Sequence, residues 1–269
     1  MKLRRCTRGS NKQPIAPENL LISKFKPKHD RTVSLARALS KLGFTSRQQA
    51  IRLIQDGRVT VNGILQKNPA YRCDLSKNRI AVDSVIIPKN EIVYIAMNKP
   101  IDVVTTRSDE LDRKTVYDLL GDVGKWVFPI GRLDKETSGL LLFTNDTRFG
   151  ERLTNPISKI PKTYRVELNK PTKLRDVEIF EQGMILDGEH LLPAKVKKLD
   201  DHTIELTIVE GKNRQIRRMC TALGYAVSSL ERIKIGKLDL RGIACGMWRY
   251  LSNTEVDSIL ACSIQKTKK

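Results

Sequence analysis

The stretch GRLDKETSGLLLFTND, Gly131 to Asp146, joins an arginine and a carboxylate to a continuous apolar run. Arg132 and Asp134 flank one leucine, and a Thr-Ser-Gly turn signal leads into the apolar block 140–143. Such a block after a turn predicts a buried strand at 140–144. The sequence therefore places an arginine and a carboxylate shortly before the start of a buried strand. Taken alone, this pair more often forms a surface ion pair than an active site.

The charge of the chain indicates a polyanionic partner. Its 269 residues carry a formal net charge of +19, and 40% of them are hydrophobic. This excess of positive charge says nothing about the fold, but it indicates nucleic acid first and an anionic membrane surface second. We expect no membrane association, because no stretch has the apolar length needed to span a bilayer and no basic amphipathic helix carries a bulky aromatic face. The length suffices for two modest domains or one large one.

The scarcity of metal-binding side chains limits the chemistry. The five cysteines are scattered and never spaced as CxxC, and there are only three histidines. This disfavours a zinc site and a Ser-His-Asp triad, so we expect neither a metal nor another cofactor. Odd, scattered cysteines also favour a reducing compartment. We therefore expect a cytoplasmic protein, with an organelle as the alternative, and a reaction carried by carboxylates, arginines, hydroxyls or aromatic rings.

Changes in composition along the chain divide it into five parts. They are a basic arm (1–32), a small compact unit (33–85), a linker (86–92), a larger domain (93–262) and a basic tail (263–269). The arm is either a solvated tail or an electrostatic tether to RNA, and the residues do not separate these two interpretations.

The compact unit contains two helices followed by a hairpin. Ser46 and Gln49 form a capping-box pattern at the start of a helix over 47–55, and Asn62-Gly63 is a strong hairpin turn signal. The segment SRQQAIRLIQDGRVTVNG, 46–63, resembles the S4-type RNA-binding module. Basic residues on its helices are either a solvated face or RNA contacts. The resemblance favours RNA contacts, and the candidates are Arg37, Arg47, Arg52 and Arg58.

The larger domain mixes short strands with few helices. We expect strands at 93–97, 140–144, 164–168, 194–199, 203–208 and 235–240, and helices around 115–120, 173–182 and 213–223. Strands and helices do not alternate one for one. The pattern therefore predicts an α+β domain with a mainly antiparallel sheet flanked by helices, rather than a parallel doubly wound fold.

Two further segments bear on the role of Asp134. In KTYRV (162–166), Tyr164 opens a strand and is either a core residue or a flat face for a base. In EGKNRQIRRMCTALG (210–224), three arginines crowd the start of a helix whose buried face includes Ile216. These arginines are either a solvated edge or a clamp for phosphate and carboxylate groups.

The three segments, in this order, resemble the catalytic domain of pseudouridine synthases. More closely, the chain is similar over 33–257 to the Rsu/Rlu family of ribosomal RNA pseudouridine synthases, of the RsuA, RluB, RluE and RluF type. The resemblance implies an enzyme that flips out one uridine of ribosomal RNA and isomerises it to pseudouridine. It also implies a ribosomal RNA stem-loop or an assembling ribosomal subunit as the partner. We expect a monomer.

The resemblance also assigns roles to residues. Asp134 matches the catalytic aspartate, Tyr164 the tyrosine that packs against the target base, and Arg217 the basic residue that pairs with that aspartate. The remaining expected contacts to RNA or base in this domain are Arg132, Ile216, Arg214 and Gln215. Three positions depart from the family pattern without removing a catalytic group, and we expect them to affect loop shape and through it the choice of RNA site: Asp102, Thr147 and Asn155.

Several alternatives remain open at this point. The main one is a non-catalytic RNA-binding or ribosome-assembly factor, which would not need the trio of Asp134, Tyr164 and Arg217. Another is a synthase that acts on transfer or messenger RNA. The residues also do not decide whether the aspartate attacks the ribose, attacks the uracil ring or removes a proton from the sugar.

Overall fold

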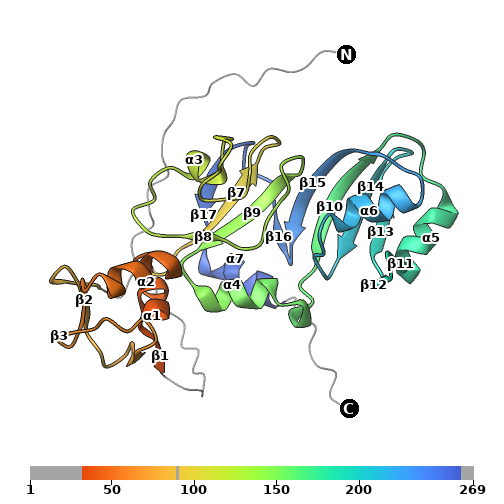
Figure 1. The fold of residues 1–269 in the computed structure, drawn as a ribbon. Helices are drawn as coiled ribbons and strands as arrows, with labels where there is room; N and C mark the ends of the chain where they lie inside the picture. Colours follow the sequence, from red (N-terminus) through yellow and green to blue (C-terminus); the bar gives the residue numbers. More distant parts are fainter. Residues whose placement is uncertain (1–31, 89–90, 262–269) are drawn as a thin grey trace.

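The computed structural model describes residues 32–88 and 91–261. A small N-terminal unit lies at one end of the molecule, and a larger domain built on a long twisted sheet extends from it (Figure 1). The predicted tail (263–269) and all of the predicted arm except Thr32 lie outside the described residues. Within the described ranges, no helix has the length and apolarity that crossing a membrane requires.

The N-terminal unit combines two helices with two small sheets. Its helices are α1 (Leu35–Lys41) and α2 (Arg47–Gln55). Its strands are β1 (Thr32–Ser34), β2 (Val59–Val61), β3 (Ile64–Leu65), β4 (Arg72–Asp74), β5 (Ile80–Val82) and β6 (Val85–Ile86). One sheet consists of β1 and β4, and the other has the order β3-β2-β5-β6. The capping box is present, because Gln49 N donates to the Ser46 hydroxyl at 3.2 Å. Ile87 joins the buried core of this unit, which therefore extends two residues past the predicted boundary at 85.

The larger domain contains one nine-stranded sheet. Its path runs through β13 (Lys195–Lys198), β14 (Thr203–Ile208), β10 (Lys162–Leu168), β15 (Val227–Ile235), β9 (Ser138–Thr144), β7 (Tyr94–Lys99) and β17 (Trp248–Tyr250). Two short strands lie beside this path: β16 (Leu238–Asp239) on β15 and β8 (Phe128–Pro129) on β9. All strand pairs are antiparallel except β15 with β9. The prediction of an α+β fold with a mainly antiparallel sheet is confirmed.

Helices cover both faces of this sheet. They are α3 (Val116–Leu120), α4 (Thr147–Thr154), α5 (Leu174–Gln182), α6 (Gln215–Ala222) and α7 (Asn253–Leu260), with a 3-10 turn η1 (Pro156–Ser158) and a hairpin of β11 (Met184–Leu186) and β12 (Glu189–Leu191). On β9, Leu141 and Phe143 pack on the side of α3, α5 and α6, whereas Leu140 and Leu142 pack on the side of α4 and α7. Because both faces are covered, this strand is apolar at every position from 140 to 143, which explains the block in the sequence.

The sheet has a narrow joint at its centre. β15 and β9 pair through only two residue pairs, Glu231 with Ser138 and Arg232 with Gly139. The halves on either side of this joint are visible in Figure 1, one around β7 and β9 and the other around β10 and β14. Gly139 has φ +103°, and its lack of a side chain lets the two backbones approach here.

One strand prediction was wrong, and two helices were not predicted. The long strand covers 227–235, and Gly236, with φ +59°, turns the chain into β16 within the predicted strand 235–240. The mixed run VSSLERIKI hides this strand, because neighbouring elements bury its polar side chains as well. Capping signals precede both missed helices. Asp146 caps α4, and Ser252 forms a capping box with Glu255 in α7.

An ion pair links the two units. Arg37 Nη2 in α1 lies 2.7 Å from Glu151 Oε1 in α4. Since both side chains are partly exposed, the pair orients the units more than it stabilises them. The Arg37 guanidinium, predicted to contact RNA, instead binds the second domain of the same chain.

Candidate active site

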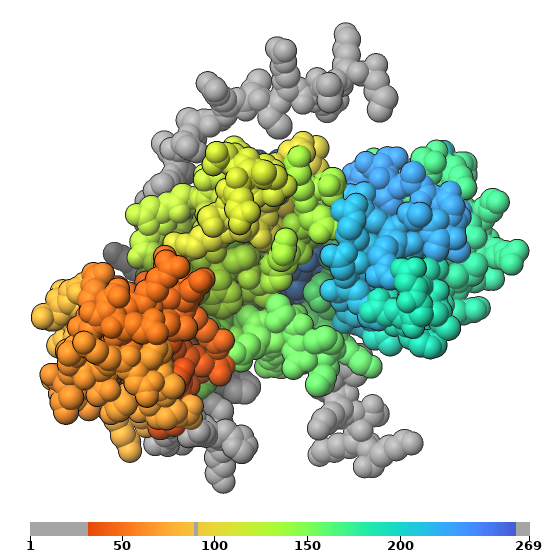
Figure 2. Space-filling view, in the orientation of Figure 1, coloured from red at the N-terminus to blue at the C-terminus, as the bar shows by residue number. Residues whose placement is uncertain are grey.

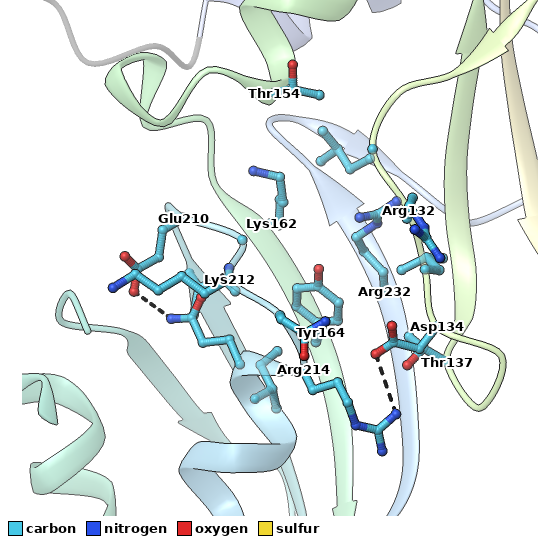
Figure 3. Close-up of a pocket in the computed structure, with 18 of the residues that line it drawn as sticks. Arg132, Asp134, Thr137, Thr154, Lys162, Tyr164, Glu210, Lys212, Arg214 and Arg232 are labelled. Atoms are coloured by element: carbon cyan, nitrogen blue, oxygen red, sulfur yellow. Dashed lines mark hydrogen bonds and ion pairs between the residues drawn. The ribbon is translucent and has the colours of Figure 1, made fainter. Parts of the chain in front are cut away.

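A cavity of about 470 Å³ opens at the central joint of the sheet. Figure 2 shows the surface hollowed between the two halves of the larger domain. Its walls bring together most of the residues singled out in the sequence (Figure 3): Arg132, Asp134, Tyr164, Arg214, Ile216 and Arg217. These residues come from the segment before β9, from β10 and from the start of α6, which are separate in the sequence.

Asp134 lies in a tight turn that the core holds in place. Leu133 is buried, while the Asp134 side chain is 40% exposed in the cavity. Thr137 N donates to Asp134 O at 3.0 Å and closes the turn. Below it, the Thr105 hydroxyl donates to Leu133 O at 2.8 Å. The carboxylate is therefore presented from a backbone that is fixed on both sides.

The fully buried Lys99 supports the same turn. Its ammonium group donates to the carbonyl oxygens of Thr137 and Pro100, each at 2.8 Å. Burial lowers the pKa of Lys99 to about 8, against a smaller opposing effect of the charges of Asp102 and Asp134. The NKP segment thus places a cation beneath the turn that carries Asp134.

Asp102, one of the departures from the family pattern, lies directly beside this turn. Its N–H donates to Lys135 O at 2.9 Å, and its φ is +63°. This left-handed conformation favours glycine, and aspartate is among the other residues that tolerate it. The other two departures lie in and beside α4. Thr147 begins that helix, and Asn155 caps η1 and lines the cavity.

Two arginines of the α6 segment converge on residues 134–136. Arg214 Nη1 lies 3.0 Å from Glu136 Oε2 and 4.0 Å from Asp134 Oδ2. The hydrogen bond from Arg214 holds the pKa of the Glu136 carboxyl below its usual value. Arg217 Nη2 instead donates to the backbone oxygen of Glu136 at 2.9 Å. The expected ion pair of Arg217 with Asp134 is therefore replaced by one from Arg214, because residue 214 precedes the helix and reaches back over the turn.

Tyr164 and Ile216 form the apolar part of the wall. They are 8% and 4% exposed and line the cavity from β10 and α6. Gln215, which was predicted to contact RNA or the base, lies next to them. Its side chain is 3% exposed, donates to Glu210 Oε1 at 2.6 Å and accepts from Lys212 N at 3.1 Å. Through these contacts Gln215 shapes the loop before α6, and it also lines the cavity.

The arginines predicted for RNA contact in the N-terminal unit differ in their surroundings. Arg47 and Arg52 lie exposed on α2. Arg58 forms a bidentate pair with Asp83, with Nε 2.8 Å from Oδ1, and its charge is partly neutralised there. Arg37 and Arg58 each pair with a carboxylate, whereas within the described residues Arg47 and Arg52 of α2 do not.

Three basic residues of the cavity were not predicted: Lys162, Arg232 and Lys212, whose ammonium group donates to His190 O at 2.6 Å and lies 3.1 Å from Glu189 Oε1. Lys162 lies two positions before Tyr164 on β10, and Arg232 lies on the neighbouring strand β15. Arg232 is 4% exposed, and its Nε donates to Leu140 O at 2.7 Å. A signal for Lys162 exists in the sequence, because residues two apart on a strand share a face. Arg232 gave no such signal, since its strand was not predicted.

The buried Lys99 makes stability depend on pH. Its pKa is about 8 in the folded protein, whereas the ordinary value of a lysine, which applies to the unfolded chain, is 10.5. Between these values the unfolded chain binds more protons, so stability rises with pH in this window. Between pH 7.5 and 10, we expect the free energy of unfolding to rise by roughly 2 kcal/mol more in the native protein than in the Lys99→Met variant. Urea titrations of both proteins across this range measure the difference, and parallel curves would contradict the assignment.

Comparisons with known proteins agree with this arrangement. The family model described as RNA pseudouridylate synthase matches residues 93–222, and the S4 domain model matches 33–78. The chain is 36% identical to ribosomal large subunit pseudouridine synthase B of Bacillus subtilis, over 84% of this chain and 95% of that protein. It is 35% identical to the dual-specificity RNA pseudouridine synthase RluF of Escherichia coli K12, over 84% and 78%.

Two further matches are as extensive. Ribosomal small subunit pseudouridine synthase A of Vibrio cholerae is 37% identical over 80% of this chain and 94% of that protein. The crystal structure of a pseudouridylate synthase superposes with a TM-score of 0.63 and 31% identity, over 84% of this chain and 99% of that one. An S4 domain, a synthase domain and the shared identity over both show that the chain belongs to the Rsu/Rlu family of RNA pseudouridine synthases.

Proposed function

We propose that this protein converts one specific uridine of ribosomal RNA into pseudouridine, with Asp134 as the catalytic carboxylate. The observation that carries this proposal is the placement of that carboxylate. It is partly exposed in a cavity, on a fixed turn, beside Arg214 and across from Tyr164 and Ile216. A flat apolar wall opposite a carboxylate suits a uracil ring whose glycosidic bond is to be broken.

The reaction needs no net input of atoms or electrons. The bond from N1 of uracil to C1′ of the ribose breaks, the base rotates, and a bond from C5 to C1′ forms. The proton on C5 is lost, and N1 gains one. Asp134 serves either as a nucleophile on the ribose or the uracil ring, or as the base that removes a sugar proton.

The target nucleotide must leave its stack to reach Asp134. Flipping a base out of RNA structure costs a few kcal/mol in enzymes of this kind. Stacking on the Tyr164 ring returns on the order of 1–3 kcal/mol. Arg132, which is exposed at the rim of the cavity, is positioned to support the flipped state from the RNA side.

Ribosomal RNA is the favoured substrate, for two reasons. Relatives that match most of this chain are named for the large and the small ribosomal subunit. The chain also carries an S4 domain with exposed arginines on α2, which suits a structured stem-loop or an assembling subunit. A pure binding factor would not need Asp134, Tyr164 and the α6 arginines to face one cavity. The enzyme is proposed to act as a cytoplasmic monomer.

The test uses the purified protein with unmodified transcripts of small- and large-subunit RNA and with immature subunits. New pseudouridine is mapped by carbodiimide adducts that stop primer extension. One new stop in ribosomal RNA is expected. Tight binding to every ribosomal substrate with no stop would favour the assembly-factor reading, and a stop in transfer or messenger RNA alone would reassign the substrate.

The S4 domain makes a prediction of its own. Arg52→Glu reverses a charge on α2, and we expect it to weaken RNA binding roughly 10-fold and to flatten the salt dependence of binding. The rate of the bound complex should stay unchanged. Arg175→Glu on α5, at the opposite end of the molecule in Figure 1, is the matched control and should bind like the native protein. Equal weakening by both changes would show that only net charge matters.

A further inference from the structure

Two basic side chains of the cavity, the half-buried Lys162 and the buried Arg232, have no part in the chemistry described so far. Lys162 on β10 and Arg232 on β15 line the same wall as Tyr164, and Figure 3 shows both of them on the side of Tyr164 that faces Thr154. They extend the cavity beyond the space between Asp134 and Tyr164. A uracil ring alone would not occupy this part of the cavity.

Neither cation has a carboxylate partner in residues 32–88 and 91–261. Arg232 is 4% exposed, its Nε is bound by Leu140 O, and its buried Nη2 has no hydrogen-bond partner among the described residues. The contact of Lys162 Nζ with Ile160 O is long, at 3.4 Å. No carboxylate in the described ranges lies within ion-pair distance of either group. Burial of Lys162, and then the charge of Arg232, lower the pKa of Lys162 to about 8.

The two carboxylates that line the cavity are engaged elsewhere. Glu210 accepts from Gln215 Nε2 at 2.6 Å and from Leu192 N at 3.0 Å. Asp134 lies beside Arg214. A charge that is removed from water without a partner destabilises the protein. An anion supplied by the ligand would therefore interact favourably with this pair of cations.

We propose that Lys162 and Arg232 bind one phosphodiester group that adjoins the target uridine. The inference rests on the proposed function, because RNA is then the ligand that carries this anion into the cavity. A free Arg232 Nη2 and an ammonium group on neighbouring strands offer a directed donor and a point charge to phosphate oxygens. The contact anchors the flipped nucleotide by its backbone while Tyr164 holds its base. It also explains how the cavity distinguishes a uridine within a chain from a free nucleoside.

The test removes the phosphate charge and the lysine charge separately and together. Stem-loop RNAs carry a single uncharged methylphosphonate on either the 5′ or the 3′ side of the target uridine. Affinity and single-turnover rate are measured for the native protein, for Lys162→Met and for Lys195→Met, an exposed lysine on β13 that lies outside the cavity.

One of the two linkages should lower the rate divided by Kd of the native protein about 10–100-fold. The same linkage should change Lys162→Met less than about 3-fold, whereas Lys195→Met should behave like the native protein. Equal losses in the native and Lys162→Met proteins, or no loss at either linkage, would overturn the proposal. A native protein that makes no pseudouridine on unmodified RNA would refute the proposed function instead, and affinities alone would then decide on the phosphate contact.

A melting experiment separates this role from a structural one. Because the Lys162 charge is half-buried and no carboxylate of the described residues pairs with it, Lys162→Met is expected to melt at the same temperature as the native protein or a few degrees higher. A lysine that stabilises the fold would give a lower melting temperature. Arg232→Lys, which keeps the charge but loses the directed donor, should show a partial loss of the same coupling.

Discussion

Replacing Asp134 by asparagine is expected to abolish pseudouridine formation and to leave RNA binding intact. The two side chains have the same shape, so the turn held by Thr137 and Thr105 persists. The amide is neither a nucleophile nor a base. Because Glu210, the other carboxylate of the cavity, is bound by its neighbours, no group is positioned to replace Asp134. The expected loss is at least about 1,000-fold in the single-turnover rate, or about 4 kcal/mol of transition-state stabilisation.

The measurement follows the hydrogen on C5. RNA labelled with tritium at C5 of uridine releases the label into water as the new carbon–carbon bond forms, and filter binding gives the affinity in parallel. Asp102→Asn is the matched control, because that carboxylate lies on the adjoining loop but is 73% exposed. The control should release tritium at close to the native rate. Release by Asp134→Asn at a comparable rate would place the chemistry on another group.

Replacing Gly139 by alanine is expected to have the largest effect on stability. With φ +103°, an alanine here is strained, and its Cβ would overlap the carbonyl oxygen of Arg232 and stand 2.7 Å from its backbone nitrogen. The clash falls on one of the two residue pairs that join β9 to β15. Both contacts are with backbone, so neither strand can yield without opening the joint. We expect a loss above about 4 kcal/mol, which lowers the melting temperature by roughly 10 °C or prevents folding.

Gly131→Ala provides the comparison for this change. Its φ is +75°, but no atom outside its chain neighbours lies within 4 Å of a Cβ built there. It therefore reports the cost of the backbone conformation alone, about 1 kcal/mol or a few degrees. Thermal melts of the two variants separate strain from overlap. Equal shifts would show that β9 and β15 can move apart at little cost.

The sequence predicted those elements whose signals lie within a few neighbouring residues. The capping box at Ser46 and the apolar block of β9 are such signals, and the structure contains both elements. The strand β15 does not, because its Arg232 and Glu231 are placed by neighbouring strands rather than by an alternation in its own sequence. The capping residues Asp146 and Ser252 precede α4 and α7, so the sequence contains local signals for these two helices as well.

The site likewise contains residues that the sequence identified and contacts that only the fold determines. The resemblance to the family selected Asp134, Tyr164 and Ile216, and the fold brings these three to one cavity. It assigned Arg217 as the partner of Asp134, whereas Arg214 lies nearest in the structure, because the left-handed backbone of Arg214, with φ +44°, directs its side chain toward the turn. The burial of Gln215 depends on Glu210 and Lys212, and only the three-dimensional structure shows these contacts.

The contact between Arg37 and Glu151 makes α4 a spacer between the two domains. Glu151 of this helix binds the S4 domain, and Thr154, three residues later, lines the cavity. A helix advances 1.5 Å per residue, so a short rigid rod separates the docking point of the S4 domain from the cavity. Under the proposed function, the distance between an RNA stem bound on α2 and a uridine at Asp134 therefore depends on the length of α4. Lengthening that helix by one turn would shift the uridine that lies within reach.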